Sequence, residues 1–268
     1  MFANFLNTKN LVSLGFILFS VVSIGFLQKP LLDKNQTRTK ADLITEATIN
    51  ESKITLLNRF PSFGFNNLIA DWTYLDFIQY YGDAEARKIL GYDLLPDYYR
   101  LIVHRDPRFI QAYFLLDPAT TLFAGRPDVS VELMNYGLKY ITPQQPRAYQ
   151  VLAFKGTDEL LFLGKTEEAE QSFLTASQWA KRENSDTSRQ LSQVYRQTAQ
   201  FLADNPDSKK ARASSWLMIL SNARDDQVRQ IALTYLEKLG AEVSYENNRI
   251  SVSVPDDIDE KKPIIDKK

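Results

Sequence analysis

The residues with the most obvious chemical potential are His104, Arg105 and Asp106, within the stretch IVHRDPRF at 102–109. In the catalytic loop of protein kinases, an aspartate in this motif orients the substrate hydroxyl, and an asparagine five residues later binds magnesium. Here the residue five positions after Asp106 is Gln111, and no Asp-Phe-Gly follows. Pro107 favours the first turn of a helix. The motif is therefore interpreted as a corner between two helices rather than a phosphotransfer site.

The sequence offers few residues for other kinds of catalysis. The chain has no cysteine and one histidine, which excludes thiol catalysis and cysteine-bound metals and leaves at most one imidazole ligand. Asp71, Asp76 and Asp83 lie close together in sequence, but on a helix the first two diverge by about 140°. They are interpreted as solvated or capping acids. We expect no catalytic residue, metal site or cofactor, and we do not expect an enzyme.

The charge distribution points to a local feature near the N-terminus. The formal net charge of the 268 residues is −1, which gives no indication of a nucleic-acid partner. Residues 1–40 nevertheless contain five basic residues and one acidic residue, and these flank an apolar run.

That run, residues 11–27, reads LVSLGFILFSVVSIGFL. Its length is close to the thickness of a bilayer core and exceeds that of a typical signal-peptide core. We expect residues 1–28 to form an uncleaved membrane anchor, with 29–41 as a linker. The anchor would use Leu11, Phe16, Phe19, Val22 and Phe26. The basic residues after the run favour a cytoplasmic C-terminal domain. The short N-terminal tail is typical of a signal anchor, and on that ground we expect the rest of the chain on the exported, periplasmic or lumenal, side.

The remainder of the chain has helical periodicity almost throughout. Breaks at proline and glycine separate the expected helices, which are 42–58, 66–82, 85–104, 108–124, 127–141, 146–163, 166–182, 186–204, 208–223 and 225–239. Residues 243–254 alternate around Asn247-Asn248 and predict a β-hairpin within 241–255. The tail 256–268 is charged and is expected to be disordered. The fold class is therefore all-α, with one helical domain over 42–240.

The segment 66–82 is the most aromatic part of the chain, and its apolar residues form two stripes. The first is Leu68, Trp72, Leu75 and Ile78, and the second is Ala70, Tyr74, Phe77 and Tyr81. A helix that is apolar on two sides is usually buried between neighbours. We therefore interpret it as a core helix, with an aromatic binding groove as the alternative.

An internal period is visible in the central helices. After Gly125 and after Gly164, a small, a large and a small residue follow at five, nine and twelve positions. In the first unit these are Ser130, Met134 and Gly137, and in the second they are Ala169, Phe173 and Ala176. Such spacing lets the second helix of a hairpin lie close to the first.

This spacing resembles the second half of a tetratricopeptide repeat, although the first-helix pattern fits badly. The overall layout is similar to bacterial, notably cyanobacterial, membrane-anchored tetratricopeptide-like proteins of unassigned function. The resemblance rests on the segment 66–82, on DPRFIQAY at 106–113 and on two units across 108–182. It implies a helical-hairpin solenoid with a scaffold or assembly role, and it transfers no catalytic residues.

The expected function is binding of a protein partner on the concave face of the solenoid, in support of a membrane complex. Aromatic residues and arginine commonly anchor interfaces, so the candidate contacts are Tyr113, Tyr136, Tyr140, Arg147 and Tyr149. The alternative is a ligand-binding or enzymatic domain with a pocket between residues 66–82 and 108–124. A third possibility is a purely structural spacer.

Overall fold

The computed structural model describes residues 8–36, 38–183, 185–204, 209–224, 226–246 and 249–253. The chain divides into two compact units, residues 1–49 and 50–268. Each is described by itself below. The expected tail 256–268 and the Asn247-Asn248 turn lie outside the described residues.

The N-terminal unit contains helix α1, Thr8–Gln36, so part of the expected linker is helical. The prediction of a membrane anchor is wrong: no helix among the described residues is both long enough and apolar enough to cross a bilayer. A span requires about 20 consecutive apolar residues, whereas serines and glycines interrupt the apolar run of α1 and lysines bound it. The single-pass topology, its exported side and the anchor in the predicted fold class are corrected accordingly.

The second helix, α2, extends from Lys40 to Arg59 and runs from the first unit into the second. It begins with a reciprocal cap, because the backbone N–H of Thr39 donates to the carboxylate of Asp42 and the N–H of Asp42 donates to the hydroxyl of Thr39. A cap of this kind satisfies N–H groups that the first turn leaves without partners. It explains why the helix begins here.

The second unit is mainly helical, as the periodicity predicted. After α2, the described elements are α3 (Asn66–Gly82), α4 (Ala84–Leu90), α5 (Leu95–Arg105), α6 (Ile110–Pro118), the π-helix η1 (Ala119–Phe123), α7 (Pro127–Gly137), α8 (Ala148–Asp158), the π-helix η2 (Glu159–Leu163), α9 (Thr166–Glu183), α10 (Asp186–Asp204), α11 (Lys209–Asn222) and α12 (Asp226–Lys238). The helix expected at 85–104 is instead two helices. Gly91 ends α4 with a φ of 71°, a conformation that glycine adopts without a steric penalty.

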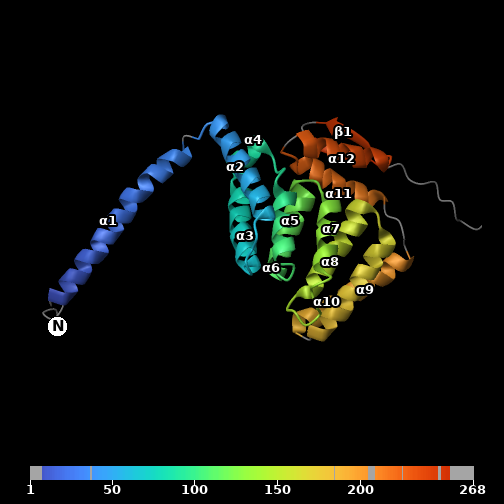
Figure 1. Cartoon of the computed structure of the whole chain (residues 1–268). Helices are drawn as coiled ribbons and strands as arrows, with labels where there is room; N and C mark the ends of the chain where they lie inside the picture. The colour runs from blue at the N-terminus through green and yellow to red at the C-terminus, as the bar shows by residue number, and fades with distance from the viewer. Residues whose placement is uncertain are drawn as a thin grey trace, which may run out of the picture. The chain divides into compact units, whose positions relative to one another are not determined.

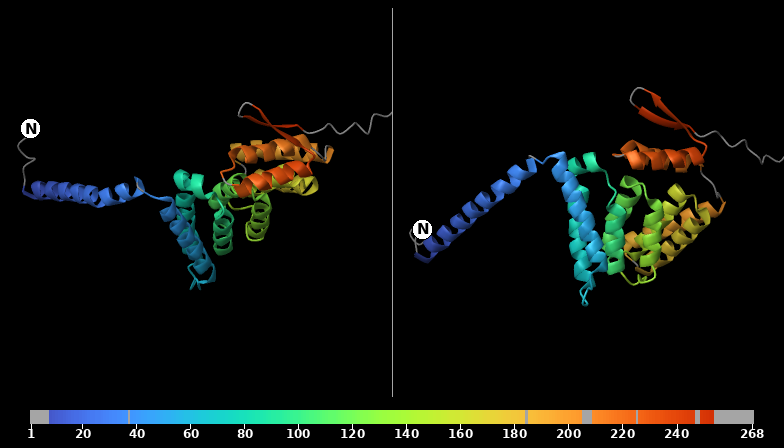
Figure 2. Two further views of the ribbon diagram at one scale, coloured as in Figure 1. Left: turned by 90° about the horizontal axis from the view of Figure 1, so that it is seen from above. Right: turned by 45° about the horizontal axis from the view of Figure 1, so that its top comes forward.

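The helices α3, α5, α7, α8, α9 and α10 lie side by side in a row (Figure 1). The pair α11 and α12 lies across the ends of these helices on one side of the row, where η1 and η2 are located (Figures 1 and 2). Trp216 of α11 is fully buried there, and its indole N–H donates to the carbonyl of Phe162 in η2 at 3.1 Å. The helical pair therefore covers the helix ends on this side of the row.

Two strands follow α12, namely β1 (Glu242–Glu246) and β2 (Arg249–Ser253). They pair antiparallel, with Ser244 opposite Ser251. The hairpin lies next to α11 and α12, as Figure 2 shows.

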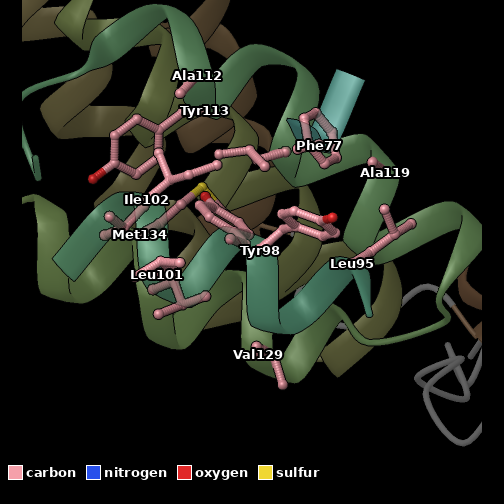
Figure 3. Close-up of a cluster of buried hydrophobic side chains, with 14 of the residues drawn as sticks. Phe77, Leu95, Tyr98, Leu101, Ile102, Ala112, Tyr113, Ala119, Val129 and Met134 are labelled. Carbon is pink, nitrogen blue, oxygen red and sulfur yellow. The ribbon is translucent and has the colours of Figure 1, made fainter. Parts of the chain in front are cut away.

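The largest apolar core extends from the last turns of α2 to α8 and is built mainly by α3, α5, α6 and α7 (Figure 3). Tyr99, Tyr113, Phe77 and Leu101 are among its fully buried side chains. Two smaller clusters lie under α11 and α12 and between α9 and α10. Burial of this continuous apolar surface is the main stabilising contribution to the row.

The positions singled out by the internal period are buried. They are Ser130, Met134, Gly137, Ala169, Phe173 and Ala176. Gly125 and Gly164 have φ angles of 64° and 67°, which explains glycine at both turns. The small residue at 137 is required, because a Cβ there would lie 1.8 Å from the hydroxyl oxygen of Tyr113. The period therefore marks close helix packing.

Candidate functional site

Arg105 holds the connection between α2 and α3. Its guanidinium donates to the carbonyls of Leu57 and Phe60, the latter at 2.8 Å, and to the side-chain oxygen of Asn66 at 3.1 Å. The carbonyls at the end of a helix lack backbone partners, and a cation satisfies them well. Arg105 thus has a structural role, as the interpretation of the HRD stretch predicted.

The neighbours of Arg105 are also engaged in packing and capping. The ring of His104 lies 4.5 Å from that of Tyr136, and its pKa is lowered by partial burial and by the charge of Arg100. The carboxylate of Asp106 accepts from the backbone N–H of Arg108 at 3.0 Å. These contacts form the corner between α5 and α6.

The outward side of α3 is apolar and exposed. We call the residues Phe65, Leu68, Trp72, Leu75 and Ile78 the α3 face; they follow one another at spacings of three or four, so they share one side of the helix. Their exposed fractions are 63%, 61%, 59%, 54% and 41%. The interpretation of this stripe as core is wrong, because the opposite side of α3, with Ala70 and Phe77, is the side that packs into the core.

The loop that leads into the α3 face also presents aromatic residues. Phe60 and Phe63 are 49% and 76% exposed, and their ring centroids lie 6.2 Å apart. Phe63 has a φ of 49°, which is unusual for a bulky residue and costs conformational energy. Arg105 fixes the start of this loop through the carbonyl of Phe60. The loop is therefore held in place while its phenylalanine rings face solvent.

The charges beside the α3 face are unevenly distributed. Asp76 is paired with Lys53 of α2, and the ammonium of Lys53 lies 6.0 Å from the ring centroid of Trp72. Asp71 is exposed and has no ion-pair partner among the described residues. It is one helical turn from both Leu68 and Leu75, so it lies at the edge of the face.

The predicted contact residues lie elsewhere, and they do not share one surface. Tyr113 and Tyr149 are buried, with exposed fractions of 0% and 3%. Tyr136 is half-buried against His104 and Tyr140, and Tyr140 is 42% exposed.

Arg147 is exposed but engaged locally. Its guanidinium lies 4.3 Å from the ring centroid of Phe114, its Nε donates to Gln150, and its backbone N–H donates to Glu183 at 2.7 Å. It therefore ties the start of α8 to α6 and α9. Of the five candidates, only Tyr136, Tyr140 and Arg147 could reach a partner.

A pair of carboxyl groups is buried between the two central hairpins. Asp117 of α6 and Asp158 of α8 are each 3% exposed and interact electrostatically. Ser130 donates to Asp117 at 2.5 Å, and Thr121 donates to Asp158 at 2.6 Å. Burial raises the pKa of Asp117 to about 6 and that of Asp158 well above its usual range. Two adjacent buried carboxylates cannot both ionise cheaply, so the pair retains a proton.

A second internal polar network lies one hairpin further along. Glu159, which is 2% exposed, accepts from Ser172 at 2.7 Å and from Lys155 at 2.5 Å. Lys155 also contacts Ser172 at 2.8 Å. In both networks an acid of the first helix bonds a serine thirteen residues later in the second helix. The sequence signal for Asp117 was a single acid within the apolar run FLLDPATTLF. The serines that bond Asp117 and Glu159 could not be identified from the sequence.

Surface hollows among the described residues include one of about 450 Å³ on α2, beside Glu51, Thr55 and Arg59. An open groove of about 860 Å³ lies between α7, α8 and α9 and is lined in part by Glu167, Glu168 and Leu152. A smaller hollow of about 360 Å³ lies between α9 and α10, beside Lys181 and Arg196. None of these hollows has the enclosed, mainly apolar form typical of small-molecule sites. Within the described residues, no group of three or more acidic or histidine side chains is arranged to hold a metal.

No protein-family model, curated protein or solved structure matches this chain. Its class is therefore defined by its fold and surface: a row of helical hairpins in which α3 exposes an apolar face.

Proposed function

We propose that this chain is a helical scaffold that binds a protein partner through the α3 face. The observation that carries the proposal is the exposure of five large apolar residues along one side of a helix whose other side is buried in the core. They expose roughly 500 Å² in total, if each side chain has about 150–250 Å² of surface. Patches of this size on a monomer are commonly interaction sites.

The position of α3 supports this proposal. It belongs to the first hairpin of the row, and stacked helical repeats normally end in a hairpin with a polar outer face. An apolar outer face at this position is suited to continued packing against another molecule. We further propose that the hairpins form a tetratricopeptide-like stack, supported by the positive φ angles of Gly125 and Gly164 and by burial at matched positions of both units.

The ligand-binding or enzymatic alternative is less well supported. It requires a pocket between residues 66–82 and 108–124, whereas the hollows described above lie along α7 to α10 and on α2. No observation among the described residues favours it over partner binding.

Affinity purification of the tagged full-length chain from its own cells tests the proposal. The variant Trp72→Ala/Leu75→Ala removes the centre of the α3 face. The matched control Val194→Ala/Phe201→Ala removes two apolar side chains of α10 that are 51% and 62% exposed. We expect one stoichiometric protein to accompany the unmodified chain and the control, and to be lost from the α3 variant while its circular dichroism spectrum is unchanged.

A partner that is retained by the α3 variant would place the interaction on another surface. A chain that purifies alone, at full yield and folded, would contradict the scaffold function.

A further inference from the structure

The α3 face suits one kind of occupant, and its geometry points to the chemistry of that occupant. We infer that it receives a single amphipathic helix of the partner, with a lysine or arginine beside Asp71. This inference rests on the proposed function and adds the form and charge of the partner segment.

The shape of the face favours a helix. Its residues recur at three- and four-residue spacings from Phe65 to Ile78, which is the pattern by which helices pack along one another. From Leu68 to Ile78 the stripe is about 15 Å long at 1.5 Å per residue, or nearly three helical turns. An extended peptide would instead require an exposed strand edge for backbone hydrogen bonds, and α3 offers none.

The N-terminal end of the α3 face is formed by an ordered loop. At its N-terminal end, Phe60 and Phe63 stand on a loop that Arg105 fixes by its hydrogen bonds to Leu57, Phe60 and Asn66. A loop that is already ordered does not lose conformational freedom on binding, which favours affinity. The loop at this end of the α3 face is therefore ordered before the partner binds.

The charges select a basic partner. Asp71 and Asp76 are the ionisable acids of α3, and α3 has no basic residue. Asp76 is neutralised by Lys53, whereas Asp71 has no ion-pair partner among the described residues. A bound apolar helix would shield Asp71 from water, and a cation on that helix would offset the loss of hydration. An acidic helix would be repelled.

A second copy of this chain is a poorer occupant. If two copies of α3 packed face to face around a two-fold axis perpendicular to the helices, the same edge of each helix would meet. The two Asp71 carboxylates would then lie on one side of the interface without an intervening cation. Like charges brought together in this way disfavour the complex.

Designed helical peptides test the inference with the full-length chain. One peptide has leucines at i, i+4, i+7 and i+11 flanked by lysines, the second replaces the lysines with glutamates, and the third scrambles the leucines of the first. The three tryptophans of the chain are labelled with 5-fluorotryptophan. Trp72 reports on the face, while the fully buried Trp216 and Trp179, which packs against the main core, report on the fold. Trp72→Phe assigns the fluorine signal.

We expect the lysine peptide to shift the Trp72 signal, leave Trp216 unchanged and bind at least about fivefold more tightly than the glutamate peptide. The scrambled peptide should bind more weakly than either. Asp71→Lys should reverse the order of the two charged peptides, and the matched change Asp226→Lys on α12 should not. Added salt should reduce the preference.

Three results would overturn the inference. Equal binding of both charged peptides, unchanged by Asp71→Lys, would remove the charge selection. A Trp72 signal that responds to none of the peptides would exclude a helix. Dimerisation in a sedimentation experiment that is abolished by Trp72→Ala would assign the face to a second copy. The first two results leave the proposed function intact if the purified partner still depends on Trp72 and Leu75, so the two failures can be told apart.

Discussion

Gly137 illustrates how one absent side chain positions two helices. It lies in α7 opposite the ring of Tyr113, whose hydroxyl donates to the carbonyl of Pro107 at 2.9 Å. Burial raises the pKa of Tyr113 well above its usual range, so the phenol remains a donor at all ordinary pH values. The internal period identified a small residue here, but the partner ring could be found only in the structure.

Gly137→Ala should therefore be destabilising. Its Cβ would lie 1.8 Å from the Tyr113 hydroxyl oxygen, which forces the two helices apart or rotates the ring. We expect the free energy of unfolding to fall by about 1–3 kcal/mol, as measured by denaturant titration. The control is Gly82→Ala at the end of α3, where a Cβ meets no atom within 4 Å; it should be neutral or slightly stabilising. Equal stability of both variants would show that the contact is loose.

At the scale of elements, the two central hairpins are joined by polar as well as apolar contacts. Asp117 of α6 and Asp158 of α8 form a buried pair of interacting acids, to which Ser130 of α7 and Thr121 of η1 donate hydrogen bonds. Both acids stand at the point where an α-helix passes into a π-helix. A hydrogen-bonded buried pair can fix the register of neighbouring helices, whereas apolar contacts alone tolerate sliding.

This pair should make stability depend on pH. Because the pKa of Asp117 is raised to about 6 and that of Asp158 is also raised, the folded chain retains a proton that the unfolded chain has already lost above about pH 4. The free energy of unfolding should therefore decrease as the pH rises from about 4 through about 6.

The variant Asp117→Asn removes one titrating group and keeps the shape of the side chain. We expect it to flatten this pH dependence in denaturant titrations between pH 4 and pH 7. The control Asp97→Asn alters an exposed acid of α5, paired with Arg100, and should leave the slope of the unmodified chain. An unchanged slope in Asp117→Asn would show that the pair does not titrate in this range.

At the scale of the whole second unit, the core is unevenly distributed. The main cluster spans the end of α2 to α8, whereas α11 and α12 are held by a smaller cluster around Trp216 and Ile219. Segments with fewer buried contacts open at lower free energy than the main core. The helices of the second unit should therefore not unfold in a single cooperative step.

Native-state hydrogen exchange checks this expectation. Backbone amides of α5, α6 and α7 should exchange most slowly, and those of α11 and α12 should exchange faster. Trp216→Phe, which loses the hydrogen bond to Phe162, should speed exchange in α11 and α12 more than in α5. Uniform protection in all helices would indicate a single cooperative unit.

The sequence by itself determined the helical nature of the chain, most helix boundaries and the turn glycines, because periodicity, proline and positive-φ positions act over a few residues. It also placed the His104-Arg105-Asp106 stretch at a corner between two helices, although it did not indicate the carbonyls that Arg105 binds. The break at Gly91 was missed because the flanking segments both favour helix.

Only the tertiary structure decided which side of α3 is buried. Its two apolar stripes are equivalent as local patterns, and the choice depends on where α5 packs. Likewise, the apolar run in α1 suggested a membrane span that the described helices do not support. The pairing of Asp117 with Asp158 and the exposure of Trp72 both arise from contacts between residues distant in sequence, and no local pattern encodes these.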